Sequence, residues 1–450
     1  MPTSPARAAA FDILLRVGRE SSYASDLLHS PAHTNLSTPD HALATELVMG
    51  VLRWRSRLDS DIATASSQPL SKLDLEILIA LRLALYQFLW LDRIPRRAAL
   101  HESVELVKRA RKRSAAPFVN AVLRKLSAAP RQPDDDAHQL TSPESLALTL
   151  AHPLWLVQRW VREYGLSAVQ QICQHNQSIP TTAIRLREPN GTSEEHLHQQ
   201  AITLIPGGLL ASARRVQAGD ITKTHAFRTG QIVIQDEASQ LVAALVTHGS
   251  HILDCCAAPG GKTLAIADHN PSAEITAVEL HPHRARLLQN LLRPHSSTSA
   301  RIQIVAADAL HLPTSMSFDR VLADVPCSGT GTLARNPEIK WRLTIEDLAE
   351  LPQRQLAILR SALAQVAPKG RLIYSTCSLE KEENENVVEQ VLSEDQSFRL
   401  LDCRIELDRL KESGELIWPD PASLTGGPYL RTIPGIHPCD GFFAAILEKV

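Results

Sequence analysis

The stretch ILDCCAAPGGKTLAIAD, from Ile252 to Asp268, decides the fold of this chain. It passes from a short apolar segment through a Gly-Gly turn into Lys-Thr and a run whose apolar residues have helical spacing. A strand, a glycine turn and a helix in this order form the repeating unit of parallel α/β sheets. Turns of this kind bind phosphates or a nucleoside, and the surrounding residues must decide which.

The chain around this turn alternates between strand-like and helical segments. The strand-like segments are QIVIQD, HILDCC, AEITAVEL, RIQIVAAD, DRVLADVPC and RLIYSTC. This alternation predicts an α/β Rossmann-like domain over residues 229–450, with a mostly parallel seven-stranded sheet covered by helices on both faces. The last segment, GFFAAILEK, is expected to be an antiparallel edge strand. Ligands of such sheets bind at the carboxyl ends of the strands.

The composition is that of a globular protein, with 44% apolar and 21% charged residues. No basic start followed by a long apolar run occurs, so no secretory signal is expected. The most apolar helical stretch, Leu73–Leu91, carries too many charges to span a membrane. The 7 cysteines are odd in number and show no CxxC pair or metal-ligand spacing. They predict a reduced, cytoplasmic setting without disulfides or a metal.

Residues 1–130 repeat apolar residues at intervals of three and four, which predicts an all-helical domain. This part holds 18 Lys and Arg against 12 Asp and Glu, a net charge of +6, while the rest of the chain is acidic. An excess of positive charge suggests a polyanionic partner. Basic residues gather between Lys108 and Arg113, where they could either face a nucleic acid or form an ordinary solvated helix end.

The polar, Pro-rich stretch AAPRQPDDDAHQLTSP predicts a domain boundary near residue 130. Residues 131–228 then combine an amphipathic helix with shorter strand-like and helical segments. They are expected to form a linker and a small α+β subdomain.

A phosphate-binding P-loop is one interpretation of the Gly-Gly-Lys-Thr turn. Its pattern, G-x-x-x-x-G-K-[ST], requires a glycine where this chain has Cys256. Pro259 also removes one of the backbone N–H groups that would hold a phosphate. Asp324, at the end of RVLAD, could imitate the acidic residue that binds magnesium. The missing glycine and the proline make a nucleoside triphosphatase the weaker alternative.

Acidic residues follow three successive strand-like segments, at Asp254, Glu279 and Asp308. Glu279 stands 19 positions after Gly260, near the spacing at which a carboxylate binds a ribose. An acidic edge suits ribose hydroxyls and amines and repels three phosphates. The trio therefore predicts S-adenosylmethionine as the ligand, although each carboxylate alone could also be a helix cap.

Two cysteines follow successive strand-like segments, Cys327 in ADVPCSGTG and Cys377 in YSTCSLE. Both stand at loop starts, which favours a function over the alternative of two inert core thiols. A thiolate that attacks C6 of a cytosine raises the electron density at C5, which then accepts a methyl group. Asp324, close before Cys327, could contact N3 of that base. Spacing alone does not say which cysteine attacks.

The motifs DCCAAPGGKT, DVPCSGTGTLARNPEIKW, YSTCSLEKEENE and DGFF together resemble those of the bacterial RsmB-type (Sun/Fmu) ribosomal RNA cytosine-5 methyltransferases. The resemblance extends over essentially the whole chain, and residues 1–130 resemble a NusB-like RNA-binding domain whose last helix matches FVNAVLRKL. It implies methylation of C5 of a specific cytosine in small-subunit (16S) ribosomal RNA through a covalent cysteine–C6 adduct. S-adenosylmethionine is the implied cofactor, and a monomer without a metal is expected.

The resemblance also implies roles for single residues. Cys377 is expected to be the nucleophile, Cys327 to assist release of the methylated RNA and Asp324 to contact the base. Glu279, where the family frequently has Asp, is expected to hold the ribose, and Asp308 to lie near adenine. The residues expected to line the cofactor are Cys256, Ala257, Ala258, Pro259, Gly260, Gly261, Lys262, Glu279, Asp308 and Asp324.

Two further expectations complete this interpretation. The segment RNPEIKW, Arg335–Trp341, is expected to lie near the RNA, and residues 131–228 to contribute further RNA contacts. A non-catalytic RNA-binding regulator is the remaining alternative, and the pair of strand-end cysteines argues against it.

Overall fold

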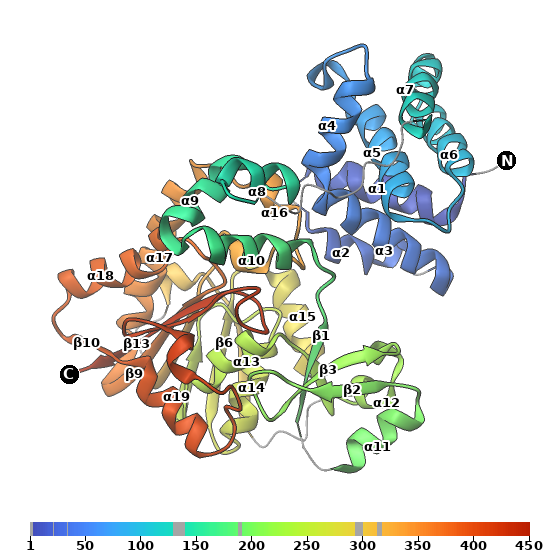
Figure 1. Ribbon diagram of the computed structural model, residues 1–450. Helices are drawn as coiled ribbons and strands as arrows, with labels where there is room; N and C mark the ends of the chain where they lie inside the picture. The colour runs from blue at the N-terminus through green and yellow to red at the C-terminus, as the bar shows by residue number, and fades with distance from the viewer. Residues whose placement is uncertain are drawn as a thin grey trace. The chain divides into compact units, whose positions relative to one another are not determined.

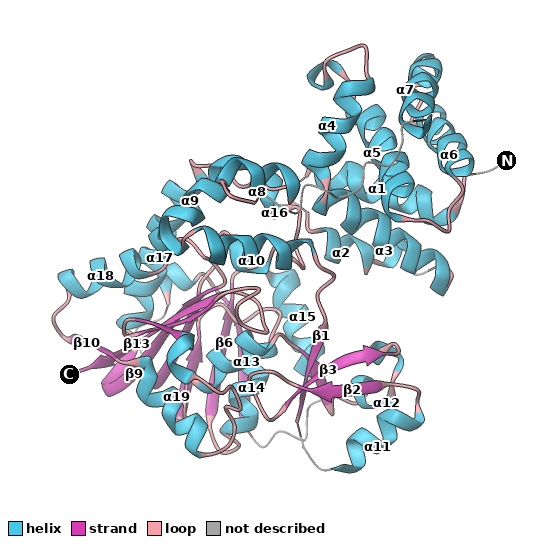
Figure 2. Ribbon diagram, in the orientation of Figure 1, coloured by secondary structure: helices cyan, strands magenta, loops and turns pink. Residues whose placement is uncertain are grey.

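The computed structural model describes residues 3–20, 22–33, 35–128, 140–187, 191–292, 300–312 and 317–450. The chain forms two compact units (Figures 1 and 2). The helical unit comprises Met1–Ile179 and Leu333–Arg342, and the sheet unit comprises Pro180–Thr332 and Leu343–Val450. None of the helices within the described ranges combines the length and apolarity needed to cross a bilayer.

The helical unit contains no β-strand among its described residues, as the sequence predicts for residues 1–130. Its α-helices are α1 (Pro5–Arg19), α2 (Ala24–Leu28), α3 (Thr38–Arg53), α4 (Arg55–Ala65), α5 (Leu75–Trp90), α6 (Arg96–Arg109), α7 (Ala116–Ala128), α8 (Pro143–Thr149), α9 (Leu154–Tyr164), α10 (Leu166–Gln177) and α16 (Ile339–Arg342). Short 3-10 helices are η1 (Pro31–His33), η2 (Leu70–Lys72) and η3 (Arg113–Ala115).

Local capping fixes where several of these helices begin. The Ser4 side chain accepts a hydrogen bond from the backbone N–H of Arg7 at the start of α1, and Ser37 accepts one from Asp40 at the start of α3. Ser142 and Ser145 form a reciprocal capping box before α8. The apolar stripes of α1, α3, α5, α6 and α7 then pack into one buried core.

The sheet unit alternates strands and helices along the chain. Its strands are β1 (Thr182–Leu186), β2 (Thr203–Pro206), β3 (Ala213–Ala218), β4 (Ile232–Ile234), β5 (His251–Asp254), β6 (Glu274–Glu279), β7 (Arg301–Ala306), β8 (Phe318–Asp324), β9 (Val366–Thr376), β10 (Phe398–Leu401), β11 (Thr425–Gly426), β12 (Tyr429–Thr432) and β13 (Phe442–Lys449).

The helices of this unit lie between the strands in sequence. The α-helices are α11 (Gly191–Gln199), α12 (His225–Arg228), α13 (Glu237–Ala244), α14 (Gly261–His269), α15 (Pro282–Leu292), α17 (Asp347–Leu363), α18 (Glu385–Glu394) and α19 (Cys403–Glu412). The 3-10 helices are η5 (Ile221–Lys223), η7 (Ala309–His311), η8 (Thr330–Thr332), η9 (Lys381–Glu383) and η10 (Pro421–Leu424).

The large sheet has the order β11-β12-β13-β9-β8-β5-β6-β7, with β10 also paired to β13. The strands β9, β8, β5, β6 and β7 are parallel to one another, which confirms the predicted α/β architecture. The described strands of this sheet number nine rather than the expected seven. Strands β10, β11 and β12 extend the sheet beyond β13, whereas QIVIQD, which was expected in this sheet, forms β4 and pairs with β1 in the smaller sheet.

The last strand, β13, is antiparallel as expected, but it is not an edge strand. It pairs with β9 on one side, and on the other side with β12 near its start and with β10 near its end. The sequence did not indicate this because β10, β11 and β12 are only two to four residues long, too short to show a period-two pattern.

Helices cover both faces of the large sheet (Figure 1), and alternate residues of each strand contribute to two separate cores. Ile252, Leu322 and Ile373 point to the face covered by α13, α14 and α19. Their neighbours Leu253 and Val321 point to the opposite face, which is covered by α17 and α18. Because both faces are buried, these strands are almost continuously apolar until they end, where the polar residues begin.

A second, antiparallel sheet of order β2-β3-β1-β4 packs within the same unit. Arg185 and Arg187 of its central region both donate hydrogen bonds to Asp268 near the end of α14. Burial opposes ionisation of that carboxyl, but the two guanidinium groups hold the pKa of Asp268 below its ordinary value. This mixed α+β arrangement agrees with the expectation for residues 131–228, although α8, α9 and α10 belong to the helical unit.

The proposed division into 1–130, 131–228 and 229–450 stays a prediction. Most of the Pro-rich stretch on which its first boundary rests, residues 129–139, lies outside the described residues.

Candidate active site

The turn after β5 is held in place by its own backbone and by one buried carboxylate. The N–H of Cys255 donates to the carbonyl of Leu322, and that of Ala257 to the carbonyl of Val278, so the turn is fastened to both neighbouring strands. Asp254 accepts a hydrogen bond from the Thr263 hydroxyl at 2.7 Å, which ties the end of β5 to α14. Burial raises the pKa of Asp254 to about 6. Asp254 therefore braces the turn from inside instead of facing a ligand.

Gly260, the last residue before α14, requires glycine for two reasons. Its φ is +115°, a conformation that L side chains rarely adopt. A Cβ at this position would also lie 2.4 Å from the Leu288 Cδ1 atom of α15. The backbone of the turn thus approaches α15 closely, as in nucleoside-binding turns where glycine lets the backbone reach a ligand.

Glu279 and Asp308 lie at the carboxyl ends of the adjacent strands β6 and β7, as the acidic-edge argument predicts. Glu279 is buried, and its Oε1 atom accepts a hydrogen bond from the N–H of His281. Asp308 is half-buried and caps η7 by accepting from the N–H of Leu310. Each carboxylate caps its own loop and also lies at the sheet edge, so the capping role is observed and the ligand role stays a prediction.

Lys262, the lysine of the turn, forms an ion pair with Asp324. Lys262 Nζ donates a hydrogen bond to Asp324 Oδ2 at 2.7 Å, and Asp324 Oδ1 accepts one from the Ser375 hydroxyl at 2.7 Å. Burial alone would lower the pKa of Lys262, but its interactions with Asp324, Cys377 and Asp254 raise it overall. Because the Lys262 ammonium is already paired with a carboxylate, it is not available to bind the phosphates of a nucleoside triphosphate. This argues against the P-loop alternative.

These residues fit S-adenosylmethionine better than a phosphate-rich nucleotide. The carboxylates of Glu279 and Asp308 can accept hydrogen bonds from ribose hydroxyls and amines, whereas they would repel three phosphates. The turn itself offers small side chains and backbone groups, and Pro259 interrupts the row of N–H donors that a phosphate needs.

The two strand-end cysteines lie in direct contact. Strands β8 and β9 are parallel neighbours, with Asp324 in register with Ser375. The Sγ atoms of Cys327 and Cys377 are 3.3 Å apart, and both side chains are partly exposed. The contact with Cys377, burial and the charge of Glu383 all raise the pKa of Cys327. Sequence spacing predicted neighbouring strands, and the structure brings the two sulfur atoms together.

The two cysteines of the turn, Cys255 and Cys256, lie in different environments. Cys255 is buried in the core beneath the turn, and burial raises its pKa well above the ordinary value. Cys256 is partly exposed beside the turn, and burial together with Asp254 and Asp324 raises its pKa as well. Neither environment favours a thiolate.

A network of buried polar groups behind the cysteine pair was missed by the sequence reasoning. Glu383 is fully buried and accepts hydrogen bonds from Ser328, Ser378 and Gln355. The available signal was that a serine directly follows each cysteine, in PCSG and TCSL.

The segment Leu333–Arg342 packs within the helical unit. The Glu338 carboxylate accepts a hydrogen bond from the N–H of Ala24, and Lys340 Nζ donates to the carbonyls of Arg53 and Ala151. Glu338 and Lys340 are each 1% exposed. These two side chains therefore face the protein interior and not an RNA, in contrast to the expectation for Arg335–Trp341. A polar run between two elements resembles a surface loop in sequence, and its buried backbone partners cannot be seen there.

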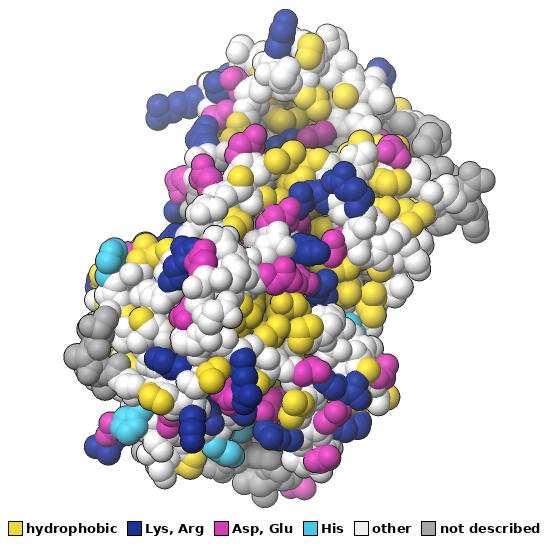
Figure 3. Space-filling model, turned by 90° about the vertical axis from the view of Figure 1, so that its left-hand side faces the viewer, with side chains coloured by type: hydrophobic (Ala, Val, Ile, Leu, Met, Phe, Trp, Pro, Cys, Tyr) yellow, Lys and Arg dark blue, Asp and Glu magenta, His cyan; other side chains and the backbone are white. Residues whose placement is uncertain are grey.

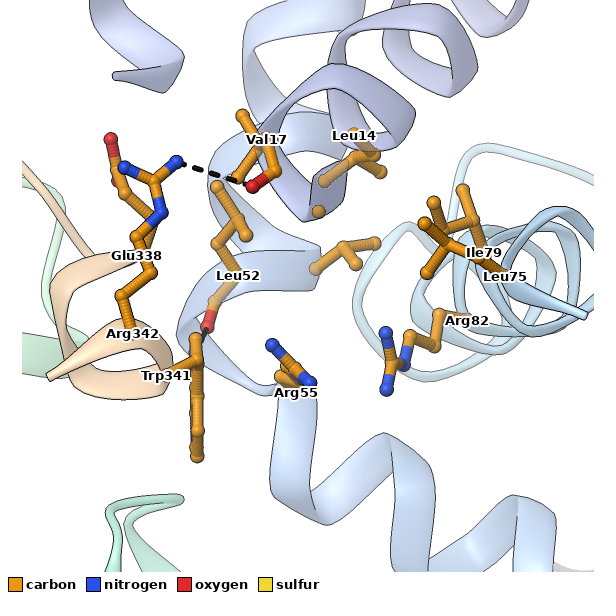
Figure 4. Close-up of a pocket in the computed structure, with 12 residues that line it drawn as sticks. Leu14, Val17, Leu52, Arg55, Leu75, Ile79, Arg82, Glu338, Trp341 and Arg342 are labelled. Carbon is orange, nitrogen blue, oxygen red and sulfur yellow. Dashed lines mark hydrogen bonds between the residues drawn. The ribbon is translucent and has the colours of Figure 1, made fainter. Parts of the chain in front are cut away.

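A hollow of about 90 Å³ lies in the helical unit beside this segment (Figure 4). The guanidinium groups of Arg55 and Arg82 enter it from one side, and Arg55 lies 5.6 Å from the centre of the Trp341 ring. Arg82 is bound to Asp59 by two hydrogen bonds of 2.6 and 2.7 Å, whereas Arg55 is 4.0 Å from the same carboxylate. Burial and the neighbouring Arg82 lower the pKa of Arg55 to about 10, so its guanidinium remains charged at neutral pH.

The contacts of the basic cluster at the end of α6 favour an ordinary solvated helix end over a surface that faces a nucleic acid. Lys108, Arg109 and Lys112 form ion pairs with Glu105, Asp12 and Asp74 of the same unit, at 2.6–2.9 Å. The face of the molecule in Figure 3 likewise shows Lys and Arg interspersed with Asp and Glu. Three of the basic side chains in the cluster are thus paired with carboxylates of the same unit.

Known families match both units of the chain. The profile of the 16S rRNA methyltransferase RsmB/F family matches residues 242–448, and that of the NusB family matches residues 4–128. A probable ribosomal RNA small subunit methyltransferase B from Bacillus subtilis (strain 168) is 33% identical over 100% of both chains. The chain belongs to the 16S rRNA methyltransferase RsmB/F family.

Further relatives agree with this family. A ribosomal RNA small subunit methyltransferase B from Vibrio cholerae is 31% identical over 98% of this chain and 97% of its own length. The crystal structure of PH0851 superposes with a TM-score of 0.80 at 22% identity and covers 100% of both chains. A methyltransferase homologue from Pyrococcus horikoshii has a TM-score of 0.57 at 24% identity, covering 69% of this chain and 99% of its own. At these identities the two structures support the fold alone.

Membership in the RsmB/F family confirms the recognition made from the sequence motifs. The chain is a methyltransferase with a NusB-like helical domain and a Rossmann-like sheet, and its cofactor is S-adenosylmethionine.

Proposed function

We propose that this family member methylates C5 of a cytosine in 16S ribosomal RNA through a covalent bond between Cys377 Sγ and C6 of the base. The observation that carries the proposal is the 3.3 Å contact between the Cys327 and Cys377 thiols, beside the Lys262–Asp324 ion pair. The relatives named ribosomal RNA small subunit methyltransferase B support 16S ribosomal RNA as the substrate.

The first chemical step needs a thiolate at Cys377. Lys262 interacts electrostatically with Cys377, so a cation stands close to the sulfur that is proposed to attack. The sulfur lone pair forms the bond to C6 while N3 takes up a proton, so electron density moves onto C5. Asp324 is the residue proposed to contact the base at N3.

The second step completes the turnover. S-adenosylmethionine, when bound, supplies the methyl group that C5 takes. Solvent water takes the C5 proton, the C5–H electron pair re-forms the C5–C6 double bond, and the C6–S electron pair returns to Cys377. N3 then gives up the proton that it took in the first step. Cys327 is the group proposed to support this release, because its thiol touches the Cys377 sulfur and can exchange a proton there.

The cofactor is proposed to lie along the edge formed by the ends of β5, β6 and β7. Glu279 would hold the ribose, Asp308 would lie near adenine, and Cys256–Gly261 with Lys262 and Asp324 would line the remaining wall. Only small groups and backbone stand in the turn, which suits close approach of an uncharged nucleoside. A stacked target base has to be flipped out to reach the thiols.

The RNA contact of the helical unit is assigned to the hollow around Arg55. Its guanidinium combines a lasting positive charge with an adjacent Trp341 ring, a pairing that suits the phosphates and bases of RNA. The aromatic share of the chain is 4%, so contacts to phosphates are expected to dominate over stacking.

A single experiment tests the proposed reaction. The full-length chain is incubated with 16S ribosomal RNA and S-adenosylmethionine, and the digested RNA is analysed by mass spectrometry for methylated nucleosides. We expect 5-methylcytidine with the wild type and none with Cys377→Ser. Methylation at another atom, or methylation of C5 by Cys377→Ser, would overturn the proposal.

A further inference from the structure

The buried carboxylate of Glu383 receives four hydrogen bonds. Oε1 accepts from the backbone N–H of Ser328 and from the Gln355 amide, each at 2.8 Å. Oε2 accepts from the hydroxyls of Ser328 and Ser378, each at 2.5 Å. Glu383 is 0% exposed, and a buried carboxylate is stable only when its lone pairs are satisfied in this way.

Three of these four hydrogen bonds come from the two loops that carry the reactive thiols, through Ser328 and Ser378. Ser328 directly follows Cys327, and Ser378 directly follows Cys377. One carboxylate oxygen thus joins the two loops, and the two serine hydroxyls are themselves 3.0 Å apart. The distance between the sulfur atoms depends on this clamp, because each cysteine is one residue away from it.

The remaining contacts around Glu383 keep the clamp rigid. Its backbone carbonyl accepts a hydrogen bond from the buried Tyr374 hydroxyl on β9. The next residue, Asn384, accepts from the Thr376 hydroxyl and donates to the Ser378 carbonyl. The carboxylate therefore cannot move away from the cysteine loops without breaking a connected network.

The charges on the two sides of the cysteine pair are opposite. Glu383 places a negative charge beside Cys327, which disfavours its thiolate. The Lys262 ammonium interacts electrostatically with Cys377. The two thiols are chemically identical and in contact, but their electrostatic surroundings differ.

We propose that Glu383 is a positioning residue that holds the two cysteine loops at contact distance and places its negative charge behind Cys327, so that only Cys377 attacks. This inference rests on the proposed function for its catalytic meaning. Glu383 does not touch the substrate in this assignment, and acts through Ser328 and Ser378.

Thiol reactivity tests the proposal without RNA. The full-length wild type and Glu383→Gln are alkylated with iodoacetamide from pH 6 to pH 10, and labelling at Cys327 and Cys377 is followed by peptide mass spectrometry. In the wild type we expect Cys377 to react first. In Glu383→Gln we expect Cys327 to react roughly tenfold faster at pH 8, with its pH midpoint lowered by about one unit.

Control variants separate this effect from a general loss of a buried carboxylate. Glu385 is also buried, and its ion pair is with Arg431 of β12, so Glu385→Gln should keep the wild-type ratio of labelling. Glu383→Asp should restore part of the selectivity, because it keeps the charge. If Glu383→Gln fails to fold, Ser378→Ala removes one donor of the clamp, and we expect a smaller shift in the same direction.

Methyl transfer gives a second readout. We expect Glu383→Gln to lower kcat about tenfold while leaving the affinity for S-adenosylmethionine unchanged. An unchanged ratio of Cys327 to Cys377 labelling in folded Glu383→Gln or Ser378→Ala overturns the positioning role, even where the wild type makes 5-methylcytidine. A wild type that makes none contradicts the proposed function, while the labelling still decides the role of Glu383.

Discussion

Lys262 Nζ lies 2.7 Å from Asp324 Oδ2, and the two side chains come from α14 and the end of β8, 62 positions apart in the chain. Their side chains are 14% and 24% exposed, so neither charge is well solvated. The pair connects the cofactor turn to the loop that carries Cys327. Loss of one partner leaves the other charge without its counter-ion in a site of low polarity.

The first prediction concerns this ion pair. We expect Asp324→Asn to lower the free energy of unfolding by about 3 kcal/mol, and Lys262→Met to do the same. The double variant should regain most of this stability, because no uncompensated charge remains, yet methyl transfer should stay abolished. Denaturant unfolding and single-turnover methylation measure the two effects. Additive losses in the double variant would show that the two charges are not coupled.

The second prediction separates the two cysteines. We expect Cys377→Ala to abolish methyl transfer and to form no covalent complex, because no thiolate reaches C6. Cys327→Ala should instead accumulate a protein–RNA adduct that survives a denaturing gel, since attack proceeds while release fails. Recovery of only free RNA from Cys327→Ala after incubation with both substrates would contradict the release role.

The third prediction tests the glycine of the cofactor turn. Gly260→Ala combines a strained φ with a clash against Leu288, so the turn must move. We expect the affinity for S-adenosylmethionine, measured by calorimetric titration, to fall at least about tenfold. Gly414→Ala is the matched control, because Gly414 has a φ of +78° and no atom within 4 Å of its would-be Cβ. It should cost about 1 kcal/mol of stability and leave cofactor affinity unchanged.

The fourth prediction concerns pH. Burial lowers the pKa of Lys340 from 10.5 to about 7, despite the opposing effect of Cys173. Between these two values the unfolded chain binds more protons than the folded one, so stability should rise with pH from about 7 to about 10. We expect this rise, about 1 kcal/mol per pH unit at most, to disappear in Lys340→Met.

Thermal unfolding at pH 7 and pH 9.5 measures the pH effect. The exposed Lys72 of the same unit supplies the control, and Lys72→Met should keep the wild-type dependence. Equal pH dependence in Lys340→Met and the wild type would mean that the buried ammonium keeps its ordinary pKa.

The fifth prediction addresses RNA binding by the helical unit. Because the Arg55 guanidinium is less tightly held by Asp59 than that of Arg82, it is the charge most available to a phosphate. We expect Arg55→Gln to weaken binding of 16S ribosomal RNA and to reduce the slope of log affinity against log salt by about one. Arg109→Gln, which removes a charge already paired with Asp12, should change the slope less.

Much of the sheet unit was predictable because its signals are local. The apolar runs, the glycine turn and the acids at the strand ends each depend on a few neighbouring residues, and they located the strands β5, β6 and β7. The same local reasoning mistook β13 for an edge strand, because the short strands β10 and β12 carry no visible period. It also expected the segment with Glu338 and Lys340 to lie near the RNA. The backbone groups that these two side chains bind are hundreds of residues away in the chain, so a local pattern could not reveal their burial.

The sequence by itself determined the chemical groups: a Gly-Gly turn that departs from the P-loop pattern, an acidic edge and two strand-end cysteines. Only the tertiary structure decided that the two sulfur atoms touch, that Lys262 is paired with Asp324, and that Glu383 joins the loops behind the cysteines. The physical reason is that these contacts join residues on different strands and loops. Their distances follow from strand order and register, which no local pattern specifies.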